Sequence, residues 1–136
     1  MLLYKDGLLE LNYEVTTDIL SVRWPDLKFF SIAEIQYSLN KLVDALKHYD
    51  IKKLLIDSTS STVEISEEEQ KTIAYKFALM LQGTRVQKVA RIINPDIKRE
   101  QRSQKISGEL TKEMTFTIQF ENFPDQASAL SWLSAK

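Results

Sequence analysis

Lys53-Leu54-Leu55-Ile56-Asp57 is the stretch that decides the fold, and the hydroxyl-bearing run Ser58-Thr59-Ser60-Ser61 follows it directly. Three consecutive apolar residues without polar alternation predict a strand that is buried on both faces. The segments on either side have helical patterns, so this strand is expected inside a sheet covered by helices. Ligand and partner sites are common at the carboxyl ends of such strands. We therefore expect a binding site at Asp57, Ser58, Thr59, Ser60 and Ser61.

The residues before the first helix predict three antiparallel strands. Residues 2–5 and 8–15 flank Asp6-Gly7, a pair typical of hairpin turns. In residues 8–15, leucine and tyrosine alternate with glutamate and asparagine, which is the pattern of a sheet with one wetter face. Residues 19–24 are expected to form the third strand.

Two long helices are predicted on either side of the central strand. Ser31 and Glu34 have the spacing of a capping box, and Ser66 and Glu69 repeat it. Gly83 is a plausible end for the second helix. Both helices have a buried stripe with helical spacing, formed in the first by Ile32, Ile35, Leu39, Leu42, Val43, Leu46 and Tyr49, and in the second by Ile73, Ala74, Phe77, Met80 and Leu81.

The rest of the chain continues the alternation of strands and helices. Residues 86–93 are expected to form a strand, after which Asn94-Pro95 is typical of a helix start. Residues 96–106 offer few apolar anchors, so a short exposed helix that ends at Gly108 is expected. Residues 114–120 alternate as a strand does, and Phe123-Pro124-Asp125 introduces a last helix. The sequence thus predicts a single α/β domain over residues 1–136, whose mixed sheet has an antiparallel N-terminal meander and β-α-β crossovers.

Composition narrows the function classes. The 136 residues include 18 basic and 19 acidic side chains and no cysteine. The balanced charge gives no reason to expect a nucleic acid partner, and the absence of cysteine excludes disulfides, thiolate nucleophiles and sulfur-ligated metals. Three glycines, all at expected turns or caps, cannot form a Gly-rich phosphate loop. We expect no cofactor, no transmembrane segment and a cytoplasmic location.

Individual polar residues each have a functional and a structural interpretation. Asp57 could act as a catalytic or phosphoacceptor carboxylate, but an aspartate that anchors its loop through backbone amides is the commoner case. His48, the single histidine, stands where it favours the C-terminus of a helix. A basic cluster could contact an anionic group or be a solvated helix face; it consists of Arg91, Lys98, Arg99, Arg102 and Lys105.

The order of these elements, together with the ending Asp125-Gln-Ala-Ser-Ala-Leu-Ser-Trp-Leu133, resembles the STAS-like family, which includes the bacterial anti-sigma-factor antagonists. The resemblance covers about residues 8–134. It implies that a serine at the start of the helix after the central strand is phosphorylated by a partner kinase, and Ser66 is the closest match. The family's Asp-Ser-Ser-Gly stretch is replaced here by Val63-Glu-Ile-Ser66-Glu-Glu-Glu69, and a helix cap is the alternative role of Ser66.

The resemblance gives two expected functions. The first is a non-catalytic interaction or regulatory module with a protein partner, or with a second copy in a homodimer. The alternative comes from related lipid-transfer-like proteins and is a small apolar or lipid ligand, for which Tyr75, Leu79, Phe29 and Phe30 could line a groove. An enzyme is not expected, because no nucleophile, base and oxyanion donor can be named together.

Overall fold

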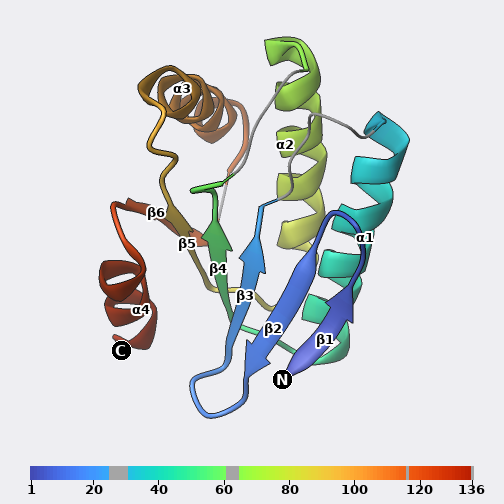
Figure 1. Ribbon diagram of the computed structural model, residues 1–136, viewed down its shortest axis with the longest axis vertical. Helices are drawn as coiled ribbons and strands as arrows, with labels where there is room; N and C mark the ends of the chain where they lie inside the picture. The colour runs from blue at the N-terminus through green and yellow to red at the C-terminus, as the bar shows by residue number, and fades with distance from the viewer. Residues whose placement is uncertain (25–30, 61–64, 116, 136) are drawn as a thin grey trace.

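A mixed sheet organises the structure, a computed structural model that describes residues 1–24, 31–60, 65–115 and 117–135 (Figure 1). In those residues six strands lie in the sequential order β1-β2-β3-β4-β5-β6. The first three are antiparallel, and β3 to β6 are parallel with a helix between each pair. This confirms the predicted α/β class. The elements are β1 (Leu2–Lys5), β2 (Glu10–Glu14), β3 (Ile19–Arg23), α1 (Ile32–His48), β4 (Lys53–Asp57), α2 (Glu67–Gln82), β5 (Lys88–Ile92), α3 (Ile97–Glu113), β6 (Gln119–Phe123) and α4 (Gln126–Ser134).

The strand β4 is the interior strand that its sequence predicts. Leu54, Leu55 and Ile56 are exposed by only 0%, 3% and 5%. Leu54 pairs in parallel register with Leu20 on one side and Val89 on the other. Because successive side chains of a strand point to opposite faces, this run contributes to two separate cores.

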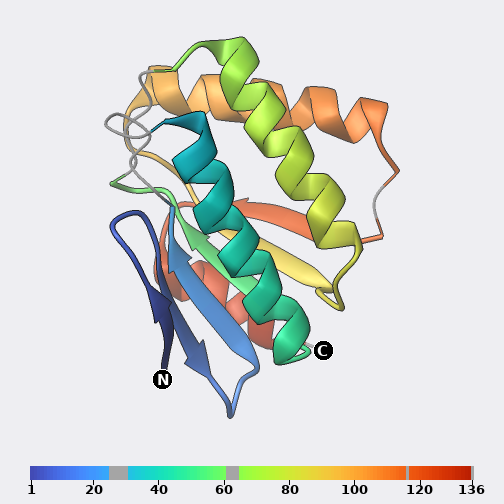
Figure 2. The ribbon, with the colours of Figure 1, turned by 90° about the vertical axis from the view of Figure 1, so that its right-hand side faces the viewer.

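Each face of the sheet carries its own core. Helices α1 and α2 cover one face, and α4 covers the other (Figure 2). The first core takes its strand residues from Leu11, Leu20, Val22, Leu54, Ile56 and Val89. The second takes Ile19, Leu55, Ala90 and Ile92, against Ala129 and Leu133 of α4. Helix α3 packs beside α2 (Figure 1).

Helices α1 and α2 both begin at the residues that local sequence signals predict. The Ser31 hydroxyl accepts from the Glu34 N–H at 3.1 Å while the Glu34 carboxylate accepts from the Ser31 N–H. Ser66 and Glu69 form the same pair of bonds at 3.0 and 3.1 Å. Each box satisfies N–H groups that the first turn of a helix leaves unpaired. Both predicted capping boxes are thus confirmed.

The β1–β2 hairpin is held by Asp6 rather than by a left-handed glycine. No described glycine has a positive φ. Instead, one Asp6 carboxylate oxygen accepts the N–H groups of Leu8 and Leu9, both at 2.7 Å. The other oxygen accepts the hydroxyls of Tyr4 at 2.8 Å and Ser38 at 2.6 Å. Asp6 therefore ties the hairpin to α1, and β2 begins only at Glu10 instead of residue 8.

The prediction for α3 was wrong in length and in its first residue. The helix spans Ile97–Glu113 and continues through Gly108, where it was expected to end. Asp96 is its N-cap, and the Asp96 carboxylate accepts the Arg99 N–H at 3.2 Å. Asn94, the expected cap, instead accepts the Asp96 N–H at 2.9 Å. Glycine lowers helix stability without forbidding a helix, which explains the longer course.

The strand β6 lies later in the chain than residues 114–120. It runs from Gln119 to Phe123, in register with β5 so that Phe120 pairs with Val89 and Phe123 with Ile92. Tertiary pairing has therefore overridden the local alternation. In the described parts of the chain, no helix is long and apolar enough to cross a membrane.

Candidate ligand pocket

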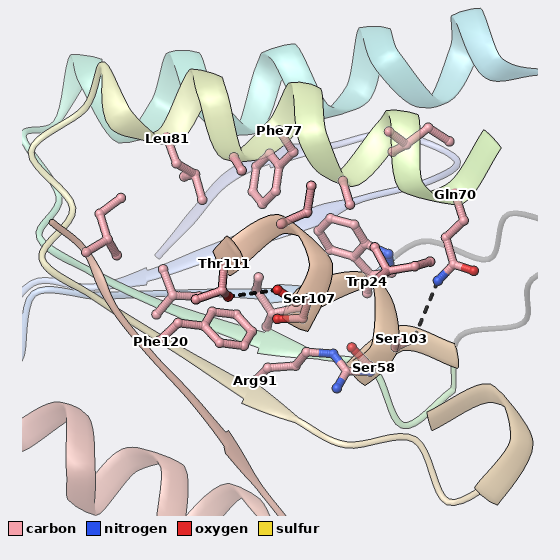
Figure 3. A pocket seen from close by; sticks show the side chains of 18 of the residues that line it. Trp24, Ser58, Gln70, Phe77, Leu81, Arg91, Ser103, Ser107, Thr111 and Phe120 are labelled. Carbon is pink, nitrogen blue, oxygen red and sulfur yellow. Dashed lines mark hydrogen bonds between the residues drawn. The ribbon is translucent and has the colours of Figure 1, made fainter. Parts of the chain in front are cut away.

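A pocket of about 520 Å³ lies between α2, α3 and the sheet. Most of its lining is apolar. The sheet contributes Ile56, Val89 and Phe120; α2 contributes Ile73, Ala74, Phe77, Ala78 and Leu81; and α3 contributes Ile106 and Leu110. Figure 3 shows Phe77 and Leu81 on α2, with Phe120 on the far side of the pocket. Trp24 also lines it, with its ring centroid 5.4 Å from that of Phe77.

Hydroxyl groups line the α3 side of this pocket. Ser103, Ser107 and Thr111 follow one another at intervals of four residues, so they lie on one face of the helix. Figure 3 shows all three on the α3 wall. The Ser103 hydroxyl accepts a hydrogen bond from Gln70 Nε2 at 3.4 Å, and the Thr111 hydroxyl donates to the Ser107 carbonyl at 2.8 Å. The pocket therefore has a hydroxyl-bearing wall opposite an apolar one.

The polar end of the pocket lies at the carboxyl ends of β4 and β5. Ser58 follows β4 and is 4% exposed, and its N–H donates to the Ile92 carbonyl at 3.1 Å. The Asn94 amide donates to the Ser58 carbonyl at 3.0 Å, which joins the two strand ends. Arg91 and Arg99 complete this part of the lining.

A buried ion pair supports that polar end. Both terminal nitrogens of Arg91 donate to the Glu100 carboxylate, at 2.8 and 2.9 Å. The two side chains are exposed by only 13% and 10%. Glu100 also accepts the Asn94 N–H at 2.8 Å and the Gln104 amide at 2.7 Å. This network fixes the first turns of α3 to β5.

This network lowers the pKa of Glu100. Burial alone raises the pKa of the carboxyl group, because it penalises the charged form. The hydrogen bonds from Arg91, Asn94 and Gln104, together with the Arg91 charge, outweigh burial, and the net pKa lies below its ordinary value. Glu100 is therefore ionised at neutral pH and neutralises Arg91.

More exposed contacts join α2 to α3. Lys71 of α2 lies 3.0 Å from Glu109 and 2.9 Å from Glu113 of α3. Lys105 of α3 lies 2.9 Å from Glu67 of α2. These pairs bridge the two helices that bound the pocket.

Two neighbouring residues of the predicted site, Asp57 and Ser58, line different hollows. Ser58 lines the apolar pocket, whereas Asp57 lines a different hollow of about 140 Å³ on the α4 side, with Arg23 and Gln126. The Asp57 carboxylate accepts the Thr59 N–H at 2.9 Å and the Thr59 hydroxyl at 2.6 Å, as an anchor for its loop. Thr59 and Ser60 are exposed, and Ser61 lies outside the described residues.

The basic residues of the predicted cluster have different surroundings. Arg91 is buried against Glu100, while Arg99 lines the pocket with its Nε 3.8 Å from Asp96. Arg102 donates to the Ile65 carbonyl at 2.8 Å. Lys98 is exposed on α3. Ser66 is the cap of α2, so its hydroxyl already has a partner in the Glu69 N–H.

Two of the groove residues proposed from the sequence do not line the pocket. Tyr75 and Leu79 are 39% and 46% exposed on α2 and do not line it. Phe29 and Phe30 lie outside the described residues. The sequence reasoning missed the hydroxyl wall, although the four-residue spacing of Ser103, Ser107 and Thr111 was a usable signal once α3 was known to continue past Gly108.

Neither a metal site nor a similar protein indicates what the pocket binds. Among the described residues, no group of three or more His, Cys, Asp or Glu side chains could hold a metal ion. No family model, no curated protein and no solved structure matches the chain. The geometry of the pocket is therefore the feature that points to a function.

Proposed function

We propose that the protein binds a small, largely apolar ligand in the pocket between α2, α3 and the sheet. The observation that carries this proposal is the pocket itself, at about 520 Å³. Pockets for small molecules usually span roughly 300–1,000 Å³ and combine apolar walls with a few placed polar groups. The polar end at Ser58, Asn94 and Arg99 supplies such groups.

Apolar surface left in contact with solvent supports this function. Phe120 lines the pocket and is 44% exposed. Met114 and Ile118 line the same region and are only partly buried. A ligand that covers such side chains gains roughly 25 cal/mol for each square ångström of apolar surface removed from water.

The packing of α3 also favours a ligand. Of its 17 residues, Ile106 and Leu110 are the buried apolar ones, and the third buried residue is Glu100. Helices that pack closely on a core usually bury three or four apolar residues in every two turns. The helix therefore bounds a space beside the sheet instead of filling it.

This function is the alternative from the sequence analysis, and it now has more support than the interaction module. Asp57 and Ser58 of the expected interaction site line two different hollows, whereas the pocket residues line a single one. An apolar or lipid ligand was also the alternative that the resemblance to the STAS-like family implied. We assign the pocket a binding role without a catalytic step.

Filling the pocket tests the proposal. Ala78 lines it from α2, so Ala78→Phe should occupy ligand space. Ala127 is exposed on α4, across the sheet, and Ala127→Phe is the matched control. Native mass spectrometry of protein purified from its own cells should show a retained small molecule in the wild type and in the control, and its loss from Ala78→Phe. Equal retention by a folded Ala78→Phe variant would contradict the proposal.

A further inference from the structure

We infer that the ligand is a ring compound with neutral oxygen groups along one edge, which the α3 hydroxyls bind along the length of the pocket. This inference rests on the proposed function and specifies the ligand class. It follows from the difference between the two long walls. Helix α3 presents Ser103, Ser107 and Thr111 beside Ile106 and Leu110, whereas the side chains that α2 presents are apolar except for Gln70.

The hydroxyl wall extends along the pocket instead of closing one end. Helical rise is about 1.5 Å per residue, so four-residue spacing separates successive hydroxyl-bearing residues by about 6 Å along the axis. A ligand with a single polar head group can use only one of these positions. A rigid ring system with oxygen atoms along one edge can reach several of them at once.

The wall can both donate and accept hydrogen bonds. The Thr111 proton is used by the Ser107 carbonyl, so the Thr111 oxygen is an acceptor. The Ser103 hydroxyl accepts from Gln70, and a hydroxyl that accepts a hydrogen bond also carries a proton that it can donate. The Gln70 Oε1 atom is buried and accepts no hydrogen bond in the described part of the chain. Hydroxyl groups on a ligand can both donate and accept hydrogen bonds, so they match this mixture of donors and acceptors.

An alkyl chain suits this wall poorly. It would remove the hydroxyls from water without replacing their hydrogen bonds, and unpaired buried polar groups are unfavourable. Charge is not the main requirement at the polar end either, because Arg91 has Glu100 as its buried counter-ion and the Arg99 Nε lies 3.8 Å from the Asp96 carboxylate. Neutral oxygens on a rigid apolar frame satisfy both walls together.

Two bile-salt probes test this inference by isothermal titration calorimetry of the full chain. Taurocholate and taurolithocholate share the ring frame and the sulfonate tail, but taurolithocholate lacks two of the hydroxyls on one face. Below micelle-forming concentrations, taurocholate should bind about fivefold more tightly or better, as expected for added hydrogen bonds. Dodecyl sulfate, an anionic alkyl chain, should bind more weakly than taurocholate.

Single-residue variants test whether the preference for taurocholate arises from the α3 hydroxyls. Ser107→Ala should reduce the affinity for taurocholate severalfold and leave that for taurolithocholate unchanged. Ser131 is exposed on α4, so Ser131→Ala should change neither affinity. Equal or tighter binding of taurolithocholate or dodecyl sulfate would overturn the ligand class while supporting an apolar pocket. Failure of all three probes to bind, with Ala78→Phe retaining its native ligand, would overturn the proposed function as well.

Discussion

At the residue scale, Glu100 is the side chain on which the polar end of the pocket depends. It accepts hydrogen bonds from Arg91, Asn94 and Gln104 while almost completely buried. Removal of one partner from a buried ion pair leaves a charge without compensation, which is usually more damaging than loss of a surface pair. The stability of α3 against β5 should therefore respond to the charge of this one carboxylate.

Replacing Glu100 with Gln should destabilise the protein in a pH-dependent way. The folded-state pKa lies below the ordinary 4.5, so the carboxylate contributes its stabilisation above that pH and loses it as pH falls through the folded pKa. Urea unfolding should show that Glu100→Gln has a lower free energy of unfolding than the wild type. This difference should be constant between pH 5 and pH 7 and become smaller below about pH 4.5.

Glu67→Gln provides the control for that measurement. Glu67 pairs with Lys105 at an exposed position, so its loss should lower the free energy of unfolding less than the loss of Glu100 does. The difference in free energy of unfolding between the wild type and Glu100→Gln could instead stay unchanged down to the lowest pH at which both fold. That result would show that the charge of Glu100 does not stabilise the protein.

At the element scale, the sequence predicts helices and strands well where the signal is local. The capping boxes of α1 and α2 and the apolar run of β4 are such signals, and all three are confirmed. The start of β6 depends on its pairing with β5, which local alternation cannot reveal. The course of α3 through Gly108 was missed because glycine weakens a helix without ending it. The pocket could not be predicted from the sequence either, because Ile73 and Phe77 show the same helical spacing whether they line a cavity or pack in a core.

Gly108→Ala should stabilise the protein by about 0.5–1 kcal/mol, because alanine favours a helix interior more than glycine does. An added Cβ at this position meets no other atom within 4 Å. Thermal and urea unfolding would measure the gain. Gly83→Ala is the control: its Cβ would lie 3.4 Å from the Met80 carbonyl at the end of α2, so a smaller change is expected. An unchanged or lower stability of Gly108→Ala would argue against a continuous helix.

At the scale of the whole molecule, β4 joins the two cores into one structure. Leu55→Asp should place an unpaired charge between β4 and α4 and cost several kcal/mol, a large part of the stability of a typical domain. Circular dichroism should show a strongly lowered melting temperature. Leu79→Asp, at an exposed position on α2, should melt close to the wild type. Near wild-type stability of Leu55→Asp would contradict the interior position of this strand.

The division into two cores has an optical consequence, because one tryptophan packs against each core. Trp24 packs against Phe77 on the α2 side of the sheet, and Trp132 packs against Phe123 on the α4 side, with ring centroids 5.5 Å apart. The Trp132→Phe variant reports fluorescence from the α2 side alone, and Trp24→Phe reports from the α4 side. Coincident emission changes during denaturation would show that the two layers unfold together. A ligand in the pocket would shift the emission of Trp24 and leave that of Trp132 constant.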